Sequence, residues 1–290
     1  MYLIHIFTSG LSLLRKVKTG TVKPAPFRKK YNVMLFLTKQ GTLLDEIGGL
    51  ARFALRFFRE AFRPRYEFSE LIHQCFVIGY KSLSLVSLTA FIMGLVLTMQ
   101  LRPSMVTYGV EAKIPAMVGI SIIREIGPVI TALIFAGKIG SSIGAELGSM
   151  RVTEQIDAME VSGTNPFKYL VVTRTLAATL MLPLLVVLSD AVSLYGSYLG
   201  VNIYEVLSFR LFYTQVIDNL AYYDAIPAFI KTFFFGFAVG IVGCYKGYYS
   251  SKGTEGVGRS ANTAVVMASV FIFILDLLAV QITELVLHFR

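Results

Sequence analysis

Long apolar stretches separated by short polar segments form the main pattern along this chain. Residues 82–101 contain no charged residue between Lys81 and Arg102. A helix of about 20 apolar residues crosses the hydrocarbon core of a bilayer. The pattern predicts membrane-spanning helices over about residues 77–101, 114–149, 168–200, 225–247 and 261–287. The predicted fold class is therefore an all-α integral membrane protein with five transmembrane helices.

Residues 43–65 precede the first predicted span and have a different character. On a helix with about 100° per residue, apolar and basic residues of this segment fall on opposite faces. The apolar face comprises Ile47, Leu50, Ala51, Ala54, Leu55, Phe58 and Phe62. The opposite face carries Asp45 and the candidate interfacial anchors Arg52, Arg56, Arg59 and Arg63. This pattern is typical of a helix that lies in the membrane interface, and a surface helix of a soluble domain is the alternative.

The uneven distribution of charge predicts the orientation of the chain. Residues 1–76 carry 13 Lys or Arg against 5 Asp or Glu, although the whole chain has a formal net charge of only +9. Basic residues also flank the loops between the second and third spans and between the fourth and fifth. Because Lys and Arg collect in cytosolic loops, we expect a multi-pass inner-membrane protein with a cytosolic N-terminus. A basic region beside a span indicates an anionic membrane surface rather than nucleic acid as its partner.

Residues 1–42 contain no acidic residue and are predicted to be a basic extension separate from the membrane domain of residues 66–290. One alternative is a translation start assigned too early, with Met34 as the true start. A transit peptide to a plastid inner envelope is a weaker alternative.

The sequence offers no candidate catalytic or metal-binding site. Its two cysteines and three histidines show neither a disulfide framework nor the spacing of metal ligands. The chain also lacks a G-x-x-x-x-G-K-[S/T] loop, so we expect it to bind no nucleotide cofactor of its own.

Small residues recur every four positions in the second predicted span, at Gly140, Gly144 and Gly148. In lipid, small residues on one face let two helix backbones approach closely. The pattern predicts either helix packing within one subunit or an interface between two subunits.

A short polar helix is predicted over about residues 153–161, with Thr153 as its N-cap and with Gly163 and Pro166 after its end. Ile156 and Met159 share a face that so short a helix cannot bury by itself. The helix is therefore either a docking element for another protein or a solvated loop helix. The candidate docking residues are Thr153, Glu154, Gln155, Ile156, Asp157, Met159 and Glu160.

Arg124 and Glu125 lie between two uncharged runs of the second span. Charge is costly in hydrocarbon, so these side chains are expected to face a polar cavity or a partner. Pro128 has no N–H to donate to the carbonyl of Arg124, which loosens the helix at this point. The functional hypothesis is a lipid cavity between two subunits, in which Arg124 attracts a phosphate and which Glu125 and Tyr108 help to line. Anchoring of the outer end of the span is the alternative.

Two segments extend these inferences, because they resemble the MlaE/YrbE family of ABC-transporter permeases. They are "REIGPVITALIFAGKIGSSIGAELGSMRVTEQIDAMEVSGTNPFKYLVVTRTLA", residues 124–177, and "GCYKGYYSSKGTEGVGRSANTAVV", residues 243–266. The resemblance covers about residues 43–290. It implies a homodimeric membrane subunit that works with a cytosolic ATPase, which binds ATP and Mg²⁺, and with an MCE-domain lipid-binding protein. It further implies transport of phospholipids or related lipids between inner and outer membranes, with "VTEQIDAMEV" as the helix that couples to the ATPase.

Two other classes of function stay open as alternatives. A secondary carrier or channel would use intramembrane acids such as Asp190 and Asp276 without a nucleotidase. These acids, with Lys231 and Glu284, are otherwise expected to join helices or to lie at the interface. A membrane-embedded lipid enzyme would need clustered nucleophiles or metal ligands, which the sequence does not suggest.

Overall fold

The structure is a computed structural model that describes residues 45–63, 67–251 and 253–288. The basic extension predicted over residues 1–42 lies outside the described residues. The chain divides into two compact units, Met1–Arg52 and Phe53–Arg290. The described residues of the first unit, 45–52, are helical, and the second unit contains the membrane helices.

Five helices in the described residues are long and apolar enough to cross a membrane. They are Phe68–Thr107, Glu111–Val152, Phe167–Asn202, Tyr222–Tyr248 and Thr254–Leu285. The prediction of an all-α membrane protein with five spans is thus confirmed. Each span is longer than the apolar stretch that predicted it, because polar turns at its ends continue the helix.

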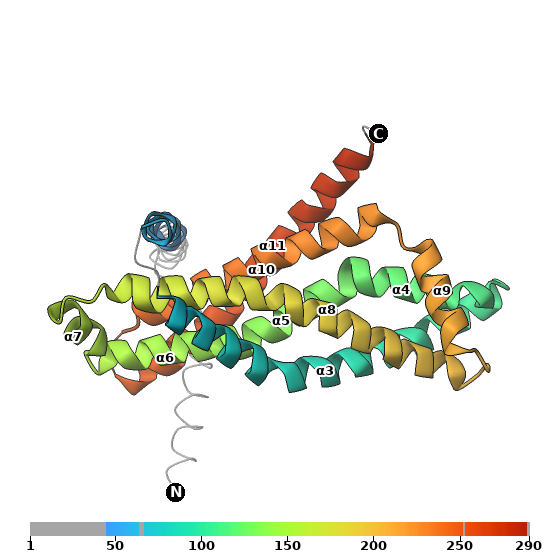
Figure 1. The fold of residues 1–290 in the computed structure, drawn as a ribbon, viewed down its shortest axis with the longest axis horizontal. Coiled ribbons are helices and arrows are strands. Elements are labelled where there is room, and N and C mark those ends of the chain that lie inside the picture. The colour runs from blue at the N-terminus through green and yellow to red at the C-terminus, as the bar shows by residue number, and fades with distance from the viewer. Residues whose placement is uncertain (1–44, 64–66, 252, 289–290) are drawn as a thin grey trace, which may run out of the picture. The chain divides into compact units, whose positions relative to one another are not determined.

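The spans are built from several labelled elements (Figure 1). The first span is α3 (Phe68–Thr107), and the fourth and fifth are α10 (Tyr222–Tyr248) and α11 (Thr254–His288). The second span begins with the short helix η1 (Glu111–Lys113) and continues as α4 (Ile114–Ser121), η2 (Ile122–Ile126), α5 (Gly127–Phe135), η3 (Ala136–Gly140) and α6 (Ser141–Val152). The third consists of η4 (Phe167–Val172) and α8 (Thr173–Asn202). The segments η2, η3 and η4 are π-helical.

Among the described residues, two short helices lie outside the spans, at opposite ends of the bundle (Figure 1). They are α7 (Gln155–Val161) and α9 (Phe209–Asn219). Sequence analysis did not predict α9. In the structure, Ser208 is the N-cap of this helix, because its hydroxyl accepts a hydrogen bond from the Leu211 N–H. The buried Phe212 and Val216 of α9 pack into a core with residues of α4 and α8.

Close backbone approach holds α3 against α8. A Cβ on Gly94 of α3 would lie 1.9 Å from the Ser193 carbonyl oxygen, and a Cβ on Gly196 of α8 would lie 2.4 Å from the Phe91 carbonyl oxygen. The Ser193 hydroxyl donates to the Ala90 carbonyl across the same contact. Only glycine fits at such distances, so two positions, one on each helix, fix the register of this pair.

The repeated glycines of the second span face other helices of the same subunit. A Cβ on Gly144 would lie 3.3 Å from Ala261 and Ala264 of α11, and a Cβ on Gly148 would lie 2.9 Å from the Ser260 hydroxyl. A Cβ on Gly140 would lie 3.4 Å from Val239 of α10. The structure therefore places Gly140, Gly144 and Gly148 in helix packing within one subunit.

The helix over residues 45–61 carries three faces rather than the predicted two. Phe53 and Phe57, which fall outside the predicted apolar face, are buried. The Phe53 ring lies 4.9 Å from the ring of Phe167, and the Phe57 ring lies 5.4 Å from that of Phe237. Most of the large residues on the predicted apolar face are exposed, namely Ile47, Leu55, Phe58 and Phe62. Leu50, predicted on that face, is buried.

Gly94→Ala is expected to lower the thermal midpoint of the purified protein. The added methyl group would meet the α8 backbone, and such overpacking costs about 1–3 kcal/mol. Differential scanning fluorimetry in detergent measures the shift. Gly137→Ala is the matched control, since a Cβ there meets nothing within 4 Å. Equal midpoints for the two variants would contradict this account of the α3–α8 contact.

Candidate functional site

The second span widens into a π-helix at the charged residues. In η2 the Gly127 N–H donates to the Ile122 carbonyl, five residues earlier. Pro128, which follows, cannot donate to the usual α-helical partner, the carbonyl of Arg124. The loosening predicted from Pro128 is thus present as a π-helical segment, and Arg124 and Glu125 lie in it.

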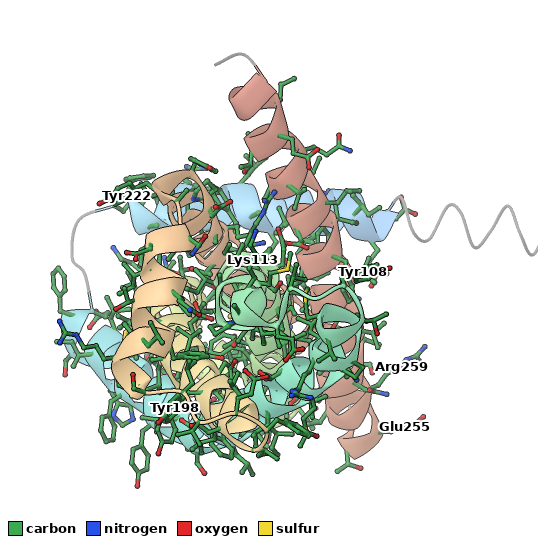
Figure 2. The ribbon with its side chains drawn as sticks, turned by 90° about the vertical axis from the view of Figure 1, so that its right-hand side faces the viewer. Tyr108, Lys113, Tyr198, Tyr222, Glu255 and Arg259 are labelled. Atoms are coloured by element: carbon green, nitrogen blue, oxygen red, sulfur yellow. The ribbon has the colours of Figure 1, made fainter. Side chains whose placement is uncertain are left out.

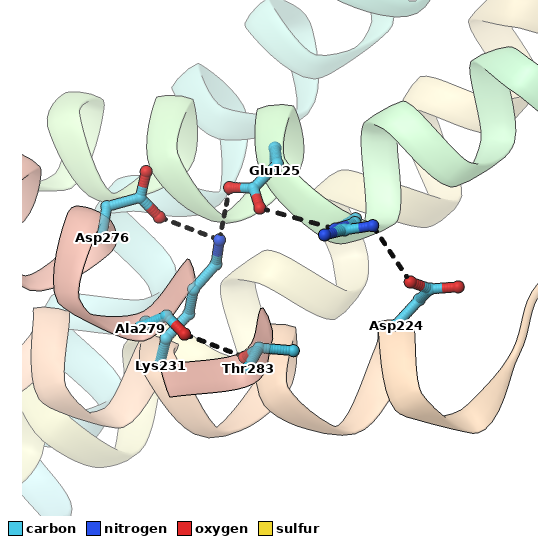
Figure 3. A network of polar contacts seen from close by, with 7 residues as sticks. Glu125, Asp224, Lys231, Asp276, Ala279 and Thr283 are labelled. Carbon is cyan, nitrogen blue, oxygen red and sulfur yellow. Dashed lines mark hydrogen bonds and ion pairs between the residues drawn. The ribbon is translucent and has the colours of Figure 1, made fainter. Parts of the chain in front are cut away.

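Lys231 joins Glu125 to an aspartate of another span (Figure 3). Lys231 Nζ of α10 lies 2.7 Å from Glu125 Oε2 and 2.9 Å from Asp276 Oδ1 of α11. Only 6% of the Lys231 side chain is exposed. A cation this deeply buried requires paired charges, and two helices supply them.

Arg124 extends the same network from Glu125 to Asp224 of α10. Its Nη1 lies 3.4 Å from Asp224 Oδ1, and its Nε lies 3.8 Å from Glu125 Oε1. Charges therefore alternate in sign in the order Asp224, Arg124, Glu125, Lys231, Asp276. We call these five residues the charged network. The longer contacts of Arg124 are the weaker ones.

A groove of about 440 Å³ between α10 and α11 adjoins this network. It is lined mainly by apolar side chains, among them Ile230, Phe234, Leu275, Leu278 and Ile282. Several of these are about half exposed, so the groove is open along one side.

A smaller hollow adjoins the groove and has a charged lining of Arg124, Glu125, Asp224 and Lys231. Five residues line both hollows, namely Tyr223, Pro227, Lys231, Ala279 and Thr283. The site thus has a long apolar part and a charged end, the shape and polarity of an amphiphile.

Tyr108 lies apart from this site. It follows α3 as its C-cap, is 79% exposed and is absent from the lining of both hollows. Figure 2, an end-on view, shows Tyr108 and Tyr222 on opposite sides. The structure brings together Arg124 and Glu125 of the predicted cavity residues, and it does not bring Tyr108 to them.

Lys231 and Asp276 belong to the site, although sequence analysis expected them to join helices or to lie at the interface, with Asp276 otherwise an acid of a secondary carrier. They do join helices, and Glu125 makes them part of the charged network. Asp190 forms no part of it. A Cβ on Gly127 would lie 1.8 Å from Asp190 Oδ1, and among the described residues this oxygen has no hydrogen-bond donor.

The short helix α7 begins later than predicted. The Thr153 hydroxyl donates back to the Ser149 carbonyl and Thr153 closes α6, so its predicted role as N-cap of the next helix is wrong. Glu154 is the N-cap of α7, with a left-handed φ of 59°, and Gln155 is the first helical residue. The left-handed residue lets the chain turn sharply between two helices.

The faces of α7 also differ from the prediction. Ile156 is 1% exposed and Met159 is half-buried, so the subunit itself covers the apolar face that sequence analysis had left for a partner. Glu154, Gln155, Asp157 and Glu160 are exposed. Arg151 of α6 pairs with Asp157 at 2.5 Å.

The candidate interfacial anchors have differing surroundings. Arg52 Nε donates to the Gly48 carbonyl within its own helix, and Arg59 is exposed. The Arg56 guanidinium lies 4.3 Å from the centre of the Phe167 ring, and Arg63 pairs with Glu60 at 2.7 Å. Three of the four thus contact protein rather than solvent alone. Among the described residues, no group of three or more His, Cys, Asp or Glu has a metal-binding arrangement.

The chain matches the family described as Permease MlaE over residues 71–282. It is 39% identical over 244 residues to a probable ABC transporter permease protein of Rickettsia bellii, covering 84% of this chain and 93% of the relative. A probable ABC transporter permease protein of Synechocystis is 36% identical over 203 residues, covering 70% and 77%. The intermembrane phospholipid transport system permease protein MlaE of Haemophilus influenzae is 31% identical over 220 residues, covering 75% and 84%. The chain therefore belongs to the MlaE family of ABC-transporter permeases.

Proposed function

We propose that this chain is the membrane subunit of an ATP-driven transporter that moves phospholipids or related lipids between the inner and outer membranes. The observation that carries the proposal is an apolar groove that ends at the charged network, in a member of this permease family. The printed name of the Haemophilus influenzae relative supports phospholipid as the substrate class. Acyl chains would occupy the groove while the headgroup meets the charged end.

The two cations of the network have different roles in this proposal. Lys231 makes short contacts at 2.7 Å and 2.9 Å and holds η2, α10 and α11 together. Arg124 contacts Asp224 at a longer 3.4 Å and is more exposed, with 37% of its side chain accessible. Arg124 can therefore exchange Asp224 for a lipid phosphate, which accepts charge-assisted hydrogen bonds from a guanidinium.

The driving force comes from a partner in this proposal. The exposed residues Glu154, Gln155, Asp157 and Glu160 of α7 contact a cytosolic ATPase, which binds ATP and Mg²⁺ and hydrolyses the nucleotide, while this chain performs no hydrolysis. The buried Ile156 ties α7 to its own subunit, so displacement of α7 would move the neighbouring α6 and η4–α8.

The rest of the assembly follows from the same proposal. Two copies of the chain form the membrane unit in the inner membrane, with the N-terminus and α7 in the cytosol. An MCE-domain protein receives or delivers the lipid. The excess of basic residues before the first span and around the loop between the second and third spans, including Lys138, Arg151 and Lys168, supports this orientation.

Arg124→Gln is expected to reduce ATP-dependent lipid transfer by about tenfold or more, since a charge-assisted hydrogen bond to phosphate contributes about 1.5–3 kcal/mol. The measurement is transfer of fluorescent phospholipid by the complex reconstituted with its ATPase. Arg210→Gln, an exposed change on α9, is the control and should transfer normally. Full transfer by Arg124→Gln would contradict the assigned role of Arg124. Nucleotide-independent transfer by the isolated wild-type chain would instead indicate a secondary carrier.

Reversing the charges of Glu154 and Glu160 to lysine is expected to abolish binding of the ATPase, because both carboxylates are exposed on α7. This pair leaves the Arg151–Asp157 contact intact, which a change at Asp157 would not. Co-purification of the ATPase with membrane-inserted protein is the measurement. Asp218→Lys on α9, at the other end of the bundle, should retain binding. If the double variant binds the ATPase as wild type does, α7 is not the docking element.

A further inference from the structure

A left-handed residue stands on each side of α7. Glu154 has φ 59° before the helix, and Gly163 has φ 82° after it. Three backbone hydrogen bonds close the last turn. The Ser162 N–H donates to the Ala158 carbonyl, the Gly163 N–H to the Glu160 carbonyl, and the Thr164 N–H to the Met159 carbonyl. The helix is therefore an internally bonded unit between two sharp chain reversals. A force on α7 reaches the third span through the short segment that follows Gly163.

That segment, residues 165–168, is bound to residues 53–63 by side chains of several kinds. Asn165 Nδ2 donates to Glu60 Oε2 at 3.1 Å. Lys168 Nζ donates to the Arg63 carbonyl at 2.8 Å. The Phe167 ring receives the Arg56 guanidinium on its face and makes an edge-to-face contact with the Phe53 ring. Three residues after α7, Asn165, Phe167 and Lys168, thus hold residues 53–63 at several points along their length.

Glu60 is the polar centre of this contact. It is 7% exposed, and both of its carboxylate oxygens have donors, Arg63 Nη1 for Oε1 and Asn165 Nδ2 for Oε2. A buried carboxylate that loses a donor is strongly destabilised. The contact therefore resists separation when residues 165–168 move.

The same stretch of residues 53–63 also holds α10. The rings of Phe57 and Phe58 lie 5.4 Å and 5.5 Å from that of Phe237, and the Phe53 ring lies 5.4 Å from that of Tyr245. Phe237 is one helical turn from Phe234, which lines the apolar groove. On the outer side of the stretch, Leu55 and Phe62 are exposed and apolar, as expected for contact with lipid chains.

We infer that residues 53–63 transmit displacement of α7 to α10 and hence to the groove. The Glu60–Asn165 hydrogen bond connects residues 53–63 to the segment that follows α7. Glu60 and Asn165 are positioning residues, since neither lines the groove. The inference rests on the proposed function in one respect, namely that an ATPase acts on α7. It assigns to this helix a mechanical role in addition to membrane attachment.

The test uses a variant that breaks the connection and a second change that restores it. Asn165→Asp sets a second carboxylate against Glu60, and the two charges repel. Adding Glu60→Gln lets the new amide donate to the carboxylate introduced at position 165, while the amide oxygen still accepts from Arg63. The introduced carboxylate also keeps the acceptor for the Lys168 N–H that Asn165 provides, so the start of η4 is unchanged.

The readout is an environment-sensitive fluorophore on Phe62→Cys in a Cys75→Ser background, in the complex with its ATPase in lipid nanodiscs. Phe62 is 81% exposed, and the remaining Cys244 is buried. ATP with vanadate should change the fluorescence of the otherwise wild-type complex. Asn165→Asp should lose this change and reduce lipid transfer per ATP hydrolysed by about tenfold, a typical size for coupling between sites. The double variant should recover both.

Asn219→Asp on α9 is the matched control and should behave as wild type, because Asn219 bonds only within its own helix in the described contacts. Absence of a nucleotide-dependent signal in the wild-type background would overturn the inference. So would a full signal in Asn165→Asp, or failure of Glu60→Gln to restore it. A wild-type complex that gives the signal but transfers no lipid would overturn the proposed function and leave the inference standing.

Discussion

A lysine ammonium inside an apolar span is the constraint around which the site is arranged. In a low-dielectric environment, Lys231 needs carboxylates at hydrogen-bond distance, and Glu125 and Asp276 supply them from two other spans. To present Glu125, the second span adopts a π-helical segment, which Pro128 favours by removing one backbone donor. The pairing fixes the halves of α10 and α11 farther from α7 relative to η2. The charged end of the groove is thus a consequence of how the helices satisfy one buried cation.

The groove itself exists because α10 and α11 change composition along their length. At the end nearer α7, α10 has glycines that meet other backbones closely, such as Gly247, whose Cβ would lie 2.9 Å from the Gly144 carbonyl oxygen. There α11 presents small residues, Ala261 and Ala264, to α6. Toward the other end both helices carry large apolar side chains, including Phe234, Leu275 and Leu278. Small residues draw helices together in lipid, and large ones keep their axes apart. The two helices accordingly separate toward the C-terminus of α11 (Figure 1).

The sequence was sufficient to predict the five spans, but it was insufficient to predict which helix faces pack against protein. A run of about 20 apolar residues has one stable outcome in a bilayer, so the five spans were predictable. Periodicity separates apolar from polar arcs, but it does not say which apolar arc meets protein and which meets lipid. For this reason sequence analysis did not predict that Phe53 and Phe57 pack against protein. It also expected Ile156 to be covered by a partner, whereas the subunit itself buries this side chain. The pairing of Lys231 with Glu125, 106 positions apart, has no local signal at all. By contrast, the sequence did contain a local signal for α9, namely Ser208 as an N-cap and the apolar pair Phe212 and Val216 four residues apart. Sequence analysis did not use this signal.

The charged network can also be placed in depth from helix geometry. Lys138 Nζ donates to the Lys81 carbonyl, so the second span and α3 carry a lysine at one level. On α3 the uncharged run of residues 82–101 begins directly after Lys81 and measures about 30 Å, the thickness of the hydrocarbon core. Arg124 precedes Lys138 by 14 residues, or about 20 Å along the same span. The network therefore lies about two-thirds of the way across the core from the lysine level. A phosphate held there would lie only about 10 Å below the nearer surface of the hydrocarbon core, while the acyl chains stay in the apolar groove.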